Sequence, residues 1–433
     1  MVKAPVGAEA IVRVDSTQSA LDSLVSIALT RSPAIAEAAA RARGAQLRIA
    51  AAGARPDPLL MAGILNFPVS QPGFSDFMTM KMLGISQSLP YPGKLGLRTR
   101  AASDEARAIG LELDAKRLDV VQVVESAYYD LVFLDRTMDI VGRNQAILGN
   151  LARAAEARYT SGSGSQTDLL RLQTEAARLD EQAVGLAETR KATLSRLNAA
   201  LDRPSDTPIS APTIPDRVAR VAVSDSTAPV HFVSAALGAR AANSPLLPMD
   251  SLESLAAQFS PMLRAHEAEV QAQAARVESA HKAHLPDFDV SLQYGQRQGN
   301  SDMISGVVSI PFPLQRGRKQ DAELAAARAD LDALEAGHRA SIDALRAEIA
   351  RGVSDLERSR TELALSTRVV IPQARATLAS ASAGYQVGRI AFSSVIDAQA
   401  SLFEIETAYW RSLTDFAKAL ADLRRTVGAE VLR

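Results

Sequence analysis

The chain has 433 residues, a formal net charge of −1 and no cysteine. Without cysteine it can hold neither disulfides nor thiolate metal sites, and the near-neutral charge gives no reason to expect a nucleic-acid partner. No stretch reaches the roughly 18 apolar residues of a membrane helix. This criterion does not detect membrane strands, which are short and alternate apolar with polar residues. Residues 1–14 lack a basic region followed by an apolar core, so no signal peptide is expected there.

The first half of the chain begins with a predicted helix and a pair of strands. Residues 18–53 have apolar side chains at helical spacing, interrupted at Ser32-Pro33, so a short helix is expected to precede a long one. Residues 57–69 and 77–90 are predicted to form a strand pair, because turn residues separate two apolar stretches.

A very long helix is predicted after the strands. Over residues 95–160, Leu, Val, Tyr and Met recur at spacings of three, four and seven, a coiled-coil-like pattern. A single helix of this length would extend about 100 Å. Glycines at 162 and 164 end it, and a second helix is predicted over 165–201 with Thr167 or Asp168 as its N-cap.

The second half of the chain predicts the same order of elements. A helix is expected after Ser260-Pro261. Residues 287–312 alternate apolar and polar side chains around a Gly-Asn turn, as a half-buried strand pair does. A long helix over 315–385 is expected to kink at Pro372.

Sequence motifs confirm that a series of segments occurs twice. Residues 89–92 (Leu-Pro-Tyr-Pro) recur as residues 310–313 (Ile-Pro-Phe-Pro). Residues 158–162 (Arg-Tyr-Thr-Ser-Gly) recur as residues 384–388 (Gly-Tyr-Gln-Val-Gly). The order of the motifs is kept, and their spacing is nearly kept. A duplication of this kind indicates one structural unit that is used twice.

These elements divide the chain into a first structural repeat over 1–203, an inter-repeat linker over 204–250 and a second structural repeat over 251–433. The second repeat ends with a helix predicted over 393–427. The linker is rich in proline and small polar residues and shows little periodicity. Each repeat is therefore a helix, a hairpin, a long helix and another helix, which is a mainly α fold with a small β part.

The two predicted hairpins supply four strands, which cannot cross a membrane alone because the edge strands would leave backbone groups unpaired in lipid. Copies from other chains must close the sheet. Three chains would supply twelve strands, an even number within the range of membrane β-barrels. The sequence thus predicts a trimeric 12-stranded membrane β-barrel, with the long coiled-coil-like helices forming an α-barrel of the same symmetry.

Several segments are similar to the TolC family of outer-membrane efflux channels. The similarity covers about residues 20–430 and rests on the duplication, on residues 88–94 (Ser-Leu-Pro-Tyr-Pro-Gly-Lys) and on the two Tyr-x-x-Gly turns. Residues 56–58 (Pro-Asp-Pro), 76–80 (Asp-Phe-Met-Thr-Met) and 85–87 (Ile-Ser-Gln) resemble the heavy-metal branch of the family, the channels of copper–silver or cobalt–zinc–cadmium systems.

The resemblance implies a homotrimer in the bacterial outer membrane, in contact with its lipid, with a helical part in the periplasm. Its partners would be a periplasmic adaptor (membrane fusion) protein and an inner-membrane pump of the resistance-nodulation-division (RND) type, with no nucleic acid. Its function would be that of a passive conduit in a tripartite efflux system, which exports metal ions or small toxic compounds from the periplasm to the exterior. Neither catalysis nor a cofactor is implied.

In that family the two helix–helix turns lie at the periplasmic tip and contact the adaptor. Gly162 in the first turn, and Val387, Gly388 and Arg389 in the second, match these positions. Each glycine is also explained by the positive φ that a helix end requires. The resemblance therefore implies that these residues form an adaptor-contact tip.

The resemblance also implies a lumen gate near the tip, made of Asp397, Asp168, Tyr385 and Tyr159. Asp397 matches a carboxylate that faces the tunnel, and a ring of such charges in a trimer would attract cations. Asp168 is a candidate for a second charge, although a role as N-cap explains it equally well. Tyr385 matches a tyrosine of the gate contacts and Tyr159 is its repeat mate, whereas the family's gate arginine aligns with Ile390.

Two patterns suggest metal binding but are better explained by ordinary structure. His281 and His284 have the spacing of metal ligands on a helix, with Asp287 nearby, yet they also form a polar helix end beside a proline turn. The second predicted strand carries alternate thioether side chains, which are soft ligands for copper but equally suit a row that faces lipid or lumen. These are Met78, Met80 and Met82. No metal site is predicted.

Two other functions are compatible with parts of the pattern. A soluble periplasmic coiled-coil adaptor or scaffold would share the long helices, but it has no use for the alternating strands of residues 287–312. A type I protein-secretion outer-membrane channel would share the whole fold. No nucleophile–base pair, phosphate loop or metal-hydrolase motif is recognisable, so an enzyme is not predicted.

Overall fold

The computed structural model describes residues 20–69, 74, 76, 78–162, 164–209, 212–223, 246–312 and 314–432. The chain forms two compact units, which we call the helical unit and the sheet unit. The helical unit comprises Met1–Glu37, Asp114–Ser260 and Asp343–Arg433, and the sheet unit comprises Ala38–Leu113 and Pro261–Ile342. The helix α3 (Lys94–Thr160, 67 residues) belongs to both units.

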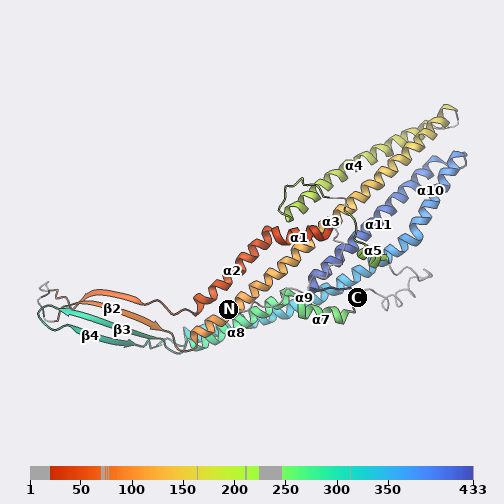
Figure 1. Ribbon diagram of the computed structural model, residues 1–433. Helices are drawn as coiled ribbons and strands as arrows, with labels where there is room; N and C mark the ends of the chain where they lie inside the picture. Colours follow the sequence, from red (N-terminus) through yellow and green to blue (C-terminus); the bar gives the residue numbers. More distant parts are fainter. Residues whose placement is uncertain are drawn as a thin grey trace. The chain divides into compact units, whose positions relative to one another are not determined.

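The sheet unit is named for its four strands, β1 (Leu59–Leu65), β2 (Met80–Leu89), β3 (Phe288–Arg297) and β4 (Met303–Ser309). They form one antiparallel sheet in the order β1-β2-β3-β4 (Figure 1). The central pair joins the two halves of the sequence, with Leu89 of β2 opposite Phe288 of β3. Helices α2 (Pro33–Gly53) and α8 (Pro261–Lys282) lead into β1 and β3, respectively.

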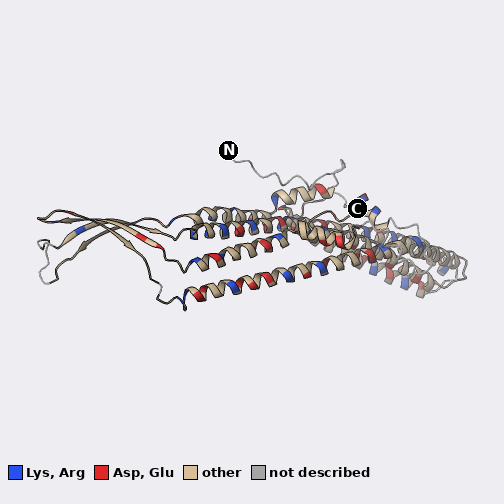
Figure 2. Cartoon of the chain, turned by 90° about the horizontal axis from the view of Figure 1, so that it is seen from below, with Lys and Arg blue, Asp and Glu red and all other residues tan. Residues whose placement is uncertain are grey.

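The two faces of the sheet differ in polarity. Because side chains alternate along a strand, residues that are opposite one another in register share a face. Leu60, Ile85 and Leu292 are opposite one another across three strands and are 77%, 50% and 56% exposed. Their face is mostly apolar, with Lys81, Gln87 and Gln296 as its polar residues, whereas the other face carries Ser86, Ser291 and the methionines Met80 and Met82. Few charged residues lie on the strands (Figure 2).

The helical unit consists of paired helices. Its elements besides α3 are α1 (Ala20–Arg31), α4 (Gln166–Ala200), α5 (Asp216–Val223), α7 (Met249–Phe259), α10 (Ile371–Gln386), α11 (Phe392–Val427) and the second half of α9 (Gln320–Leu365). Helices α3 and α4 form one antiparallel pair, and α10 and α11 form another (Figure 1). A five-residue π-helix, η1 (Ser366–Val370), connects α9 to α10. Pro372 lies in the first turn of α10, where the sequence predicted a kink.

A heptad seam builds the core between α9 and α11. Ile349, Leu356 and Leu363 recur every seven residues of α9, and all three are 0% exposed. The facing residues of α11 alternate at spacings of three and four and belong to the same cluster: Leu413, Phe416, Leu420, Leu423 and Val427. This is the spacing of coiled-coil core positions. Replacing one of these leucines by alanine would cost roughly 2–5 kcal/mol of stability, because the cavity would not collapse fully.

The mainly helical fold with a small β part is confirmed, and several details differ from the prediction. Helix α4 begins at Gln166, and its N-cap is Ser165, whose side chain accepts a hydrogen bond from Thr167 N; the assignment of Thr167 or Asp168 as N-cap is therefore wrong. The separate helix α7 was not predicted, and α5 lies within the predicted linker.

Some predictions fall on residues that the structure does not describe. They concern positions 18–19, 70–73, 75, 77, 163, 210–211, 224–245 and 313. The division into two repeats (1–203 and 251–433) and a linker (204–250) stays a prediction. Within the described ranges, no helix combines the length and the apolar character that crossing a membrane requires.

Candidate functional site

The two turns between paired helices end on glycines with left-handed backbone. Gly162 follows α3 with φ of 75°, and Gly388 follows α10 with φ of 74°. At the second turn, Gly388 N donates to Tyr385 O at 3.0 Å and Arg389 N donates to Gly384 O at 2.9 Å. These two bonds define a Schellman motif, in which the last carbonyls of the helix are satisfied and glycine avoids a steric penalty.

The surfaces of both turns are exposed. Val387 is 68% exposed, and Gly162, Gly388 and Arg389 are also exposed. Ile390 occupies the position that aligns with the gate arginine of the TolC family. Its side chain packs against Gly384 so closely that a Cβ added there would lie 2.6 Å from Ile390 Cδ1. The second turn thus presents an apolar and a basic side chain on a rigid backbone.

Arg158 connects the first turn to the second. Its guanidinium lies 4.7 Å from the centroid of the Tyr385 ring, and its Nη1 donates to the Tyr385 carbonyl oxygen. The Tyr385 ring in turn lies 5.3 Å from the ring of Phe392 at the start of α11. A cation over an aromatic face contributes about 0.5–1 kcal/mol at a site with solvent access.

Tyr385 and Tyr159, the repeat mates, have different environments. Tyr385 is 3% exposed, and its burial raises the pKa of its hydroxyl. The negative charge of Asp168 raises this pKa further, whereas the positive charge of Arg158 lowers it. Tyr159 is 46% exposed. The structure therefore brings Tyr385, Asp168 and Arg158 together, while Tyr159 lies on the surface. Arg158 was missed as a functional candidate; the signal was a charged residue at a position where the other repeat has glycine.

Asp397 lines a hollow of about 400 Å³ between α4 and α11. The other lining residues are mostly polar: Thr167, Leu170, Arg171, Thr174, Glu175, Arg178, Ser393 and Ile396. Arg178 and Glu175 form an ion pair at 2.8 Å on the α4 side. Asp397 itself is exposed. The structure thus places Asp397 beside side chains of α4 that carry both signs of charge.

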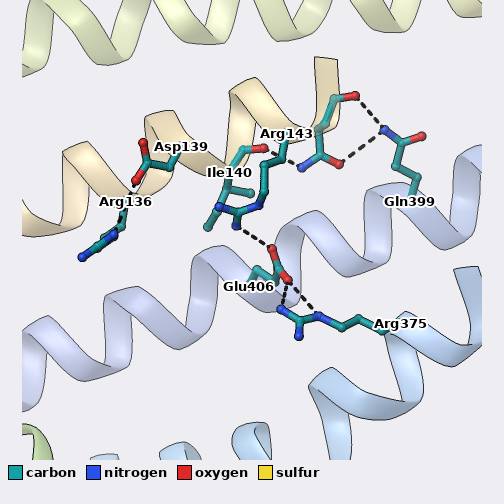
Figure 3. Close-up of polar contacts among 8 residues, drawn as sticks. Arg136, Asp139, Ile140, Arg143, Arg375, Gln399 and Glu406 are labelled. Atoms are coloured by element: carbon teal, nitrogen blue, oxygen red, sulfur yellow. Dashed lines mark hydrogen bonds and ion pairs between the residues drawn. The ribbon is translucent and has the colours of Figure 1, made fainter. Parts of the chain in front are cut away.

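Further from the turns, Glu406 of α11 binds arginines of two other helices (Figure 3). Its Oε1 accepts from Arg375 Nη2 of α10 at 2.7 Å and from Arg375 Nε at 3.2 Å. Its Oε2 accepts from Arg143 Nη2 of α3 at 3.1 Å. The Glu406 side chain is only 12% exposed, whereas the arginines are 58% and 64% exposed. We call this group the Glu406 clamp, and sequence reasoning missed it because the three residues are far apart in the chain.

A buried amide contact lies next to the clamp (Figure 3). Gln399 Nε2 donates to the backbone and side-chain oxygens of Asn144, both at 3.3 Å, and Asn144 Nδ2 donates to Ile140 O at 2.8 Å. Gln399 and Asn144 are 5% and 6% exposed. Buried amides need such partners, so this contact fixes the register of α11 against α3.

At the base of the sheet, a carboxylate connects the start of β3 to the start of α3. Asp287 Oδ1 accepts from Lys94 Nζ at 2.7 Å and from Tyr91 N at 2.8 Å, and Lys94 Nζ also donates to Leu285 O at 2.7 Å. Burial opposes ionisation of Asp287, but the hydrogen bonds from Lys94 and Tyr91 lower its pKa overall. The Tyr91 ring stacks on Phe288 at 6.4 Å. We call this arrangement the Asp287 pin.

The histidines near the pin do not form a metal site with Asp287. His284 Nε2 is 2.7 Å from Asp321 Oδ1, and this hydrogen bond raises the pKa of His284. Asp287 is occupied by Lys94 and Tyr91. Across the described part of the chain, no group of three or more His, Cys, Asp or Glu residues is placed to hold a metal ion.

Comparison with known proteins identifies relatives over most of the chain. Residues 24–203 and 252–429 match the model of the family described as "Outer membrane efflux protein". The cobalt-zinc-cadmium resistance protein CzcC of Cupriavidus metallidurans is 25% identical over 337 residues, which cover 78% of this chain and 74% of that protein.

Solved structures share the fold. The outer membrane protein VceC from Vibrio cholerae matches with a TM-score of 0.76 and 20% identity over 95% of this chain and 96% of its own. The outer-membrane channel OprN matches with a TM-score of 0.77 and 17% identity over 99% of this chain and 98% of its own. CusC, whose structures were solved in connection with transmembrane channel formation, matches with a TM-score of 0.77 and 16% identity over 94% of this chain and 92% of its own.

Proposed function

Because the chain belongs to the outer membrane efflux protein family, it is the channel component of a tripartite efflux system, and we propose that its cargo is divalent heavy-metal cations. The observation that carries this proposal is the match across 78% of the chain to a protein named for cobalt, zinc and cadmium resistance. The resemblance of the segments around β1 and β2 to the heavy-metal branch supports the same substrate class.

We propose that three copies form the channel, with the sheet in the outer membrane and the helices in the periplasm. The supporting observation is the open sheet: β1 and β4 are edge strands, and one face of the sheet exposes Leu60, Ile85 and Leu292. An exposed apolar face with unpaired edges is stable only when other chains and lipid cover it. A closed cylinder of three sheets satisfies both requirements.

The exposed turns are the proposed contact with a periplasmic adaptor, and an inner-membrane pump of the RND type would supply the energy. Gly162, Val387, Gly388 and Arg389 form this surface. Its support is the combination of high exposure with a backbone fixed by the Schellman motif, because a rigid and exposed turn loses little entropy on binding.

The proposed lumen gate contains Asp397, Asp168, Tyr385 and Tyr159. The exposure of Asp397 on α11 supports a role in attracting cations, since three such carboxylates around a threefold axis would raise the local cation concentration. The contact of Arg158 with Tyr385 supports a role for this tyrosine in holding the two turns together.

A gene deletion tests the substrate class. Cells that lack this chain should become sensitive to cobalt, zinc and cadmium, and the wild-type gene should restore growth. Copper and an organic toxicant serve as parallel challenges. Unchanged tolerance to all three divalent metals, together with sensitivity to the organic compound alone, would contradict a metal cargo while leaving the channel role intact.

A further inference from the structure

We infer that Asp57 is an intersubunit counterpart of the Asp287 pin: it binds the segment after β4 of a second copy of this chain. The inference rests on the proposed trimer and assigns residues to its closing contact. The pin lies between the end of β2 and the start of β3, the two strands that join the first half of the chain to the second half in the sheet.

The duplication provides a second copy of each side of the pin. The acceptor side, Pro286-Asp287, lies between α8 and β3; Pro56-Asp57 lies between α2 and β1. The donor side, residues 89–92 after β2, recurs as residues 310–313 after β4. Within one chain these second copies are on opposite edges of the sheet, because β1 and β4 are separated by β2 and β3.

Neither of the two repeated segments, Pro56-Asp57 and residues 310–313, has the contacts that its repeat mate makes in the pin. Asp57 is exposed, and its carboxylate makes no ion pair or hydrogen bond with the described residues. Phe312, the mate of Tyr91, is 83% exposed, whereas the Tyr91 ring stacks on Phe288. Leu314, two residues further, is 86% exposed. Large apolar side chains with this exposure indicate a surface that another molecule covers.

A second copy fits this surface in geometry. When β4 of one copy pairs with β1 of the next, the end of β4 meets the start of β1, as the end of β2 meets the start of β3. Asp57 of the second copy then accepts from Phe312 N, as Asp287 accepts from Tyr91 N. Phe312 lies against Pro58, the mate of Phe288.

A second copy also fits in charge. Gln315, the mate of Lys94, offers an amide donor to the carboxylate, and Arg316, Arg318 and Lys319 follow it in the sequence. A carboxylate that docks beside these basic residues gains attraction over several ångströms. The same pairing keeps the apolar face of the sheet continuous from one copy to the next, since Val308 and Leu60 belong to that face in both edge strands.

Cysteine cross-linking tests the docking without background, because the chain has no native cysteine. The double variant Leu59→Cys/Ser309→Cys places two cysteines opposite one another on the same face, as Ser88 is opposite Asp289. It should form covalent dimers and trimers with a bis-maleimide that reaches about 8 Å, a length that tolerates a register slip of two residues. The control Leu65→Cys/Ser309→Cys places the first cysteine about 20 Å further along β1 and should not cross-link.

Charge removal tests Asp57 itself. Asp57→Asn should lower the temperature at which the trimer dissociates on denaturing gels, as should Asp287→Asn. Arg55→Gln, an exposed change in the same loop, should behave like the wild type. Equal dissociation temperatures for Asp57→Asn and Arg55→Gln would overturn the role of Asp57.

The outcomes separate this inference from the proposed function. Trimers on gels without cross-linking at positions 59 and 309, or with equal cross-linking at positions 65 and 309, would overturn the docking and leave the trimer standing. Absence of trimers in the wild type would instead overturn the proposed channel.

Discussion

The Glu406 clamp allows a prediction whose size follows from the structure. Replacing Glu406 by Gln keeps the side chain's volume but removes the charge that holds Arg375 of α10 and Arg143 of α3. Exposed ion pairs contribute about 0.2–1 kcal/mol each. Solvent screens each pair at the arginines, which are more than half exposed, but the carboxylate is only 12% exposed and places both pairs in the upper part of this range. The two pairs together should therefore contribute about 1–2 kcal/mol.

Amide hydrogen exchange measures this contribution locally. If local opening of α10 breaks the clamp, a loss of about 1–2 kcal/mol speeds exchange in α10 by roughly 5–30-fold, because each 1.4 kcal/mol is a factor of ten. Amides of α8, which belongs to the sheet unit, should exchange as in the wild type. The matched control is Glu188→Gln, which removes an ion pair with Lys191 whose side chains are 72% and 65% exposed, and it should change little.

Two results would refute the reasoning. Exchange in α10 that stays within about twofold of the wild type would show that the arginines bind water equally well and that the clamp does not hold the helix. Faster exchange across the whole helical unit, including α9, would indicate a global loss of stability rather than release of α10.

Three further predictions follow from the tip and from the base of the sheet. Gly388→Leu should weaken cross-linking to the adaptor while trimers persist, because φ of 74° costs a non-glycine residue roughly 1–2 kcal/mol; full cross-linking would refute the contact. Asp397→Ala should weaken block by multivalent cations in single-channel recordings, and unchanged block would remove Asp397 from the lumen. The hydrogen bond from protonated His284 to Asp321 should be strongest at a pH below the ordinary histidine pKa of about 6.5. It should weaken as the pH rises through the raised pKa of His284, because the imidazole then loses its charge. Proteolysis between α8 and β3 should therefore quicken with pH in the wild type, and a His284→Gln variant that kept this pH dependence would contradict the assignment.

Periodicity predicted the long elements because their residues bury at regular spacing. The Leu, Val, Tyr and Met pattern over 95–160 predicted α3, and Val124, Tyr128 and Leu131 of that pattern are 0%, 1% and 0% exposed. Alternation likewise predicted β3, whose polar and apolar residues lie on opposite faces of the sheet. Glycines at 162 and 388 predicted the turns, because only glycine adopts positive φ there without strain.

Contacts between distant segments were not predictable in the same way. Arg158 reaches Tyr385, and Glu406 reaches Arg143, only because the fold packs α3 against α10 and α11. The N-cap of α4 was misassigned because Ser165, Thr167 and Asp168 are all capping residues, and the backbone decides which one caps. Pro372 predicted a kink but not the π-helix that precedes it.

The central claim is that three copies of this chain form a channel in the outer membrane. The most direct measurement is fractionation of cells that express the native gene, followed by denaturing gels of unheated and heated membranes. The account predicts a heat-modifiable trimer in the outer-membrane fraction that conducts ions in a planar bilayer. Recovery of the chain from the soluble fraction as a monomer would contradict it.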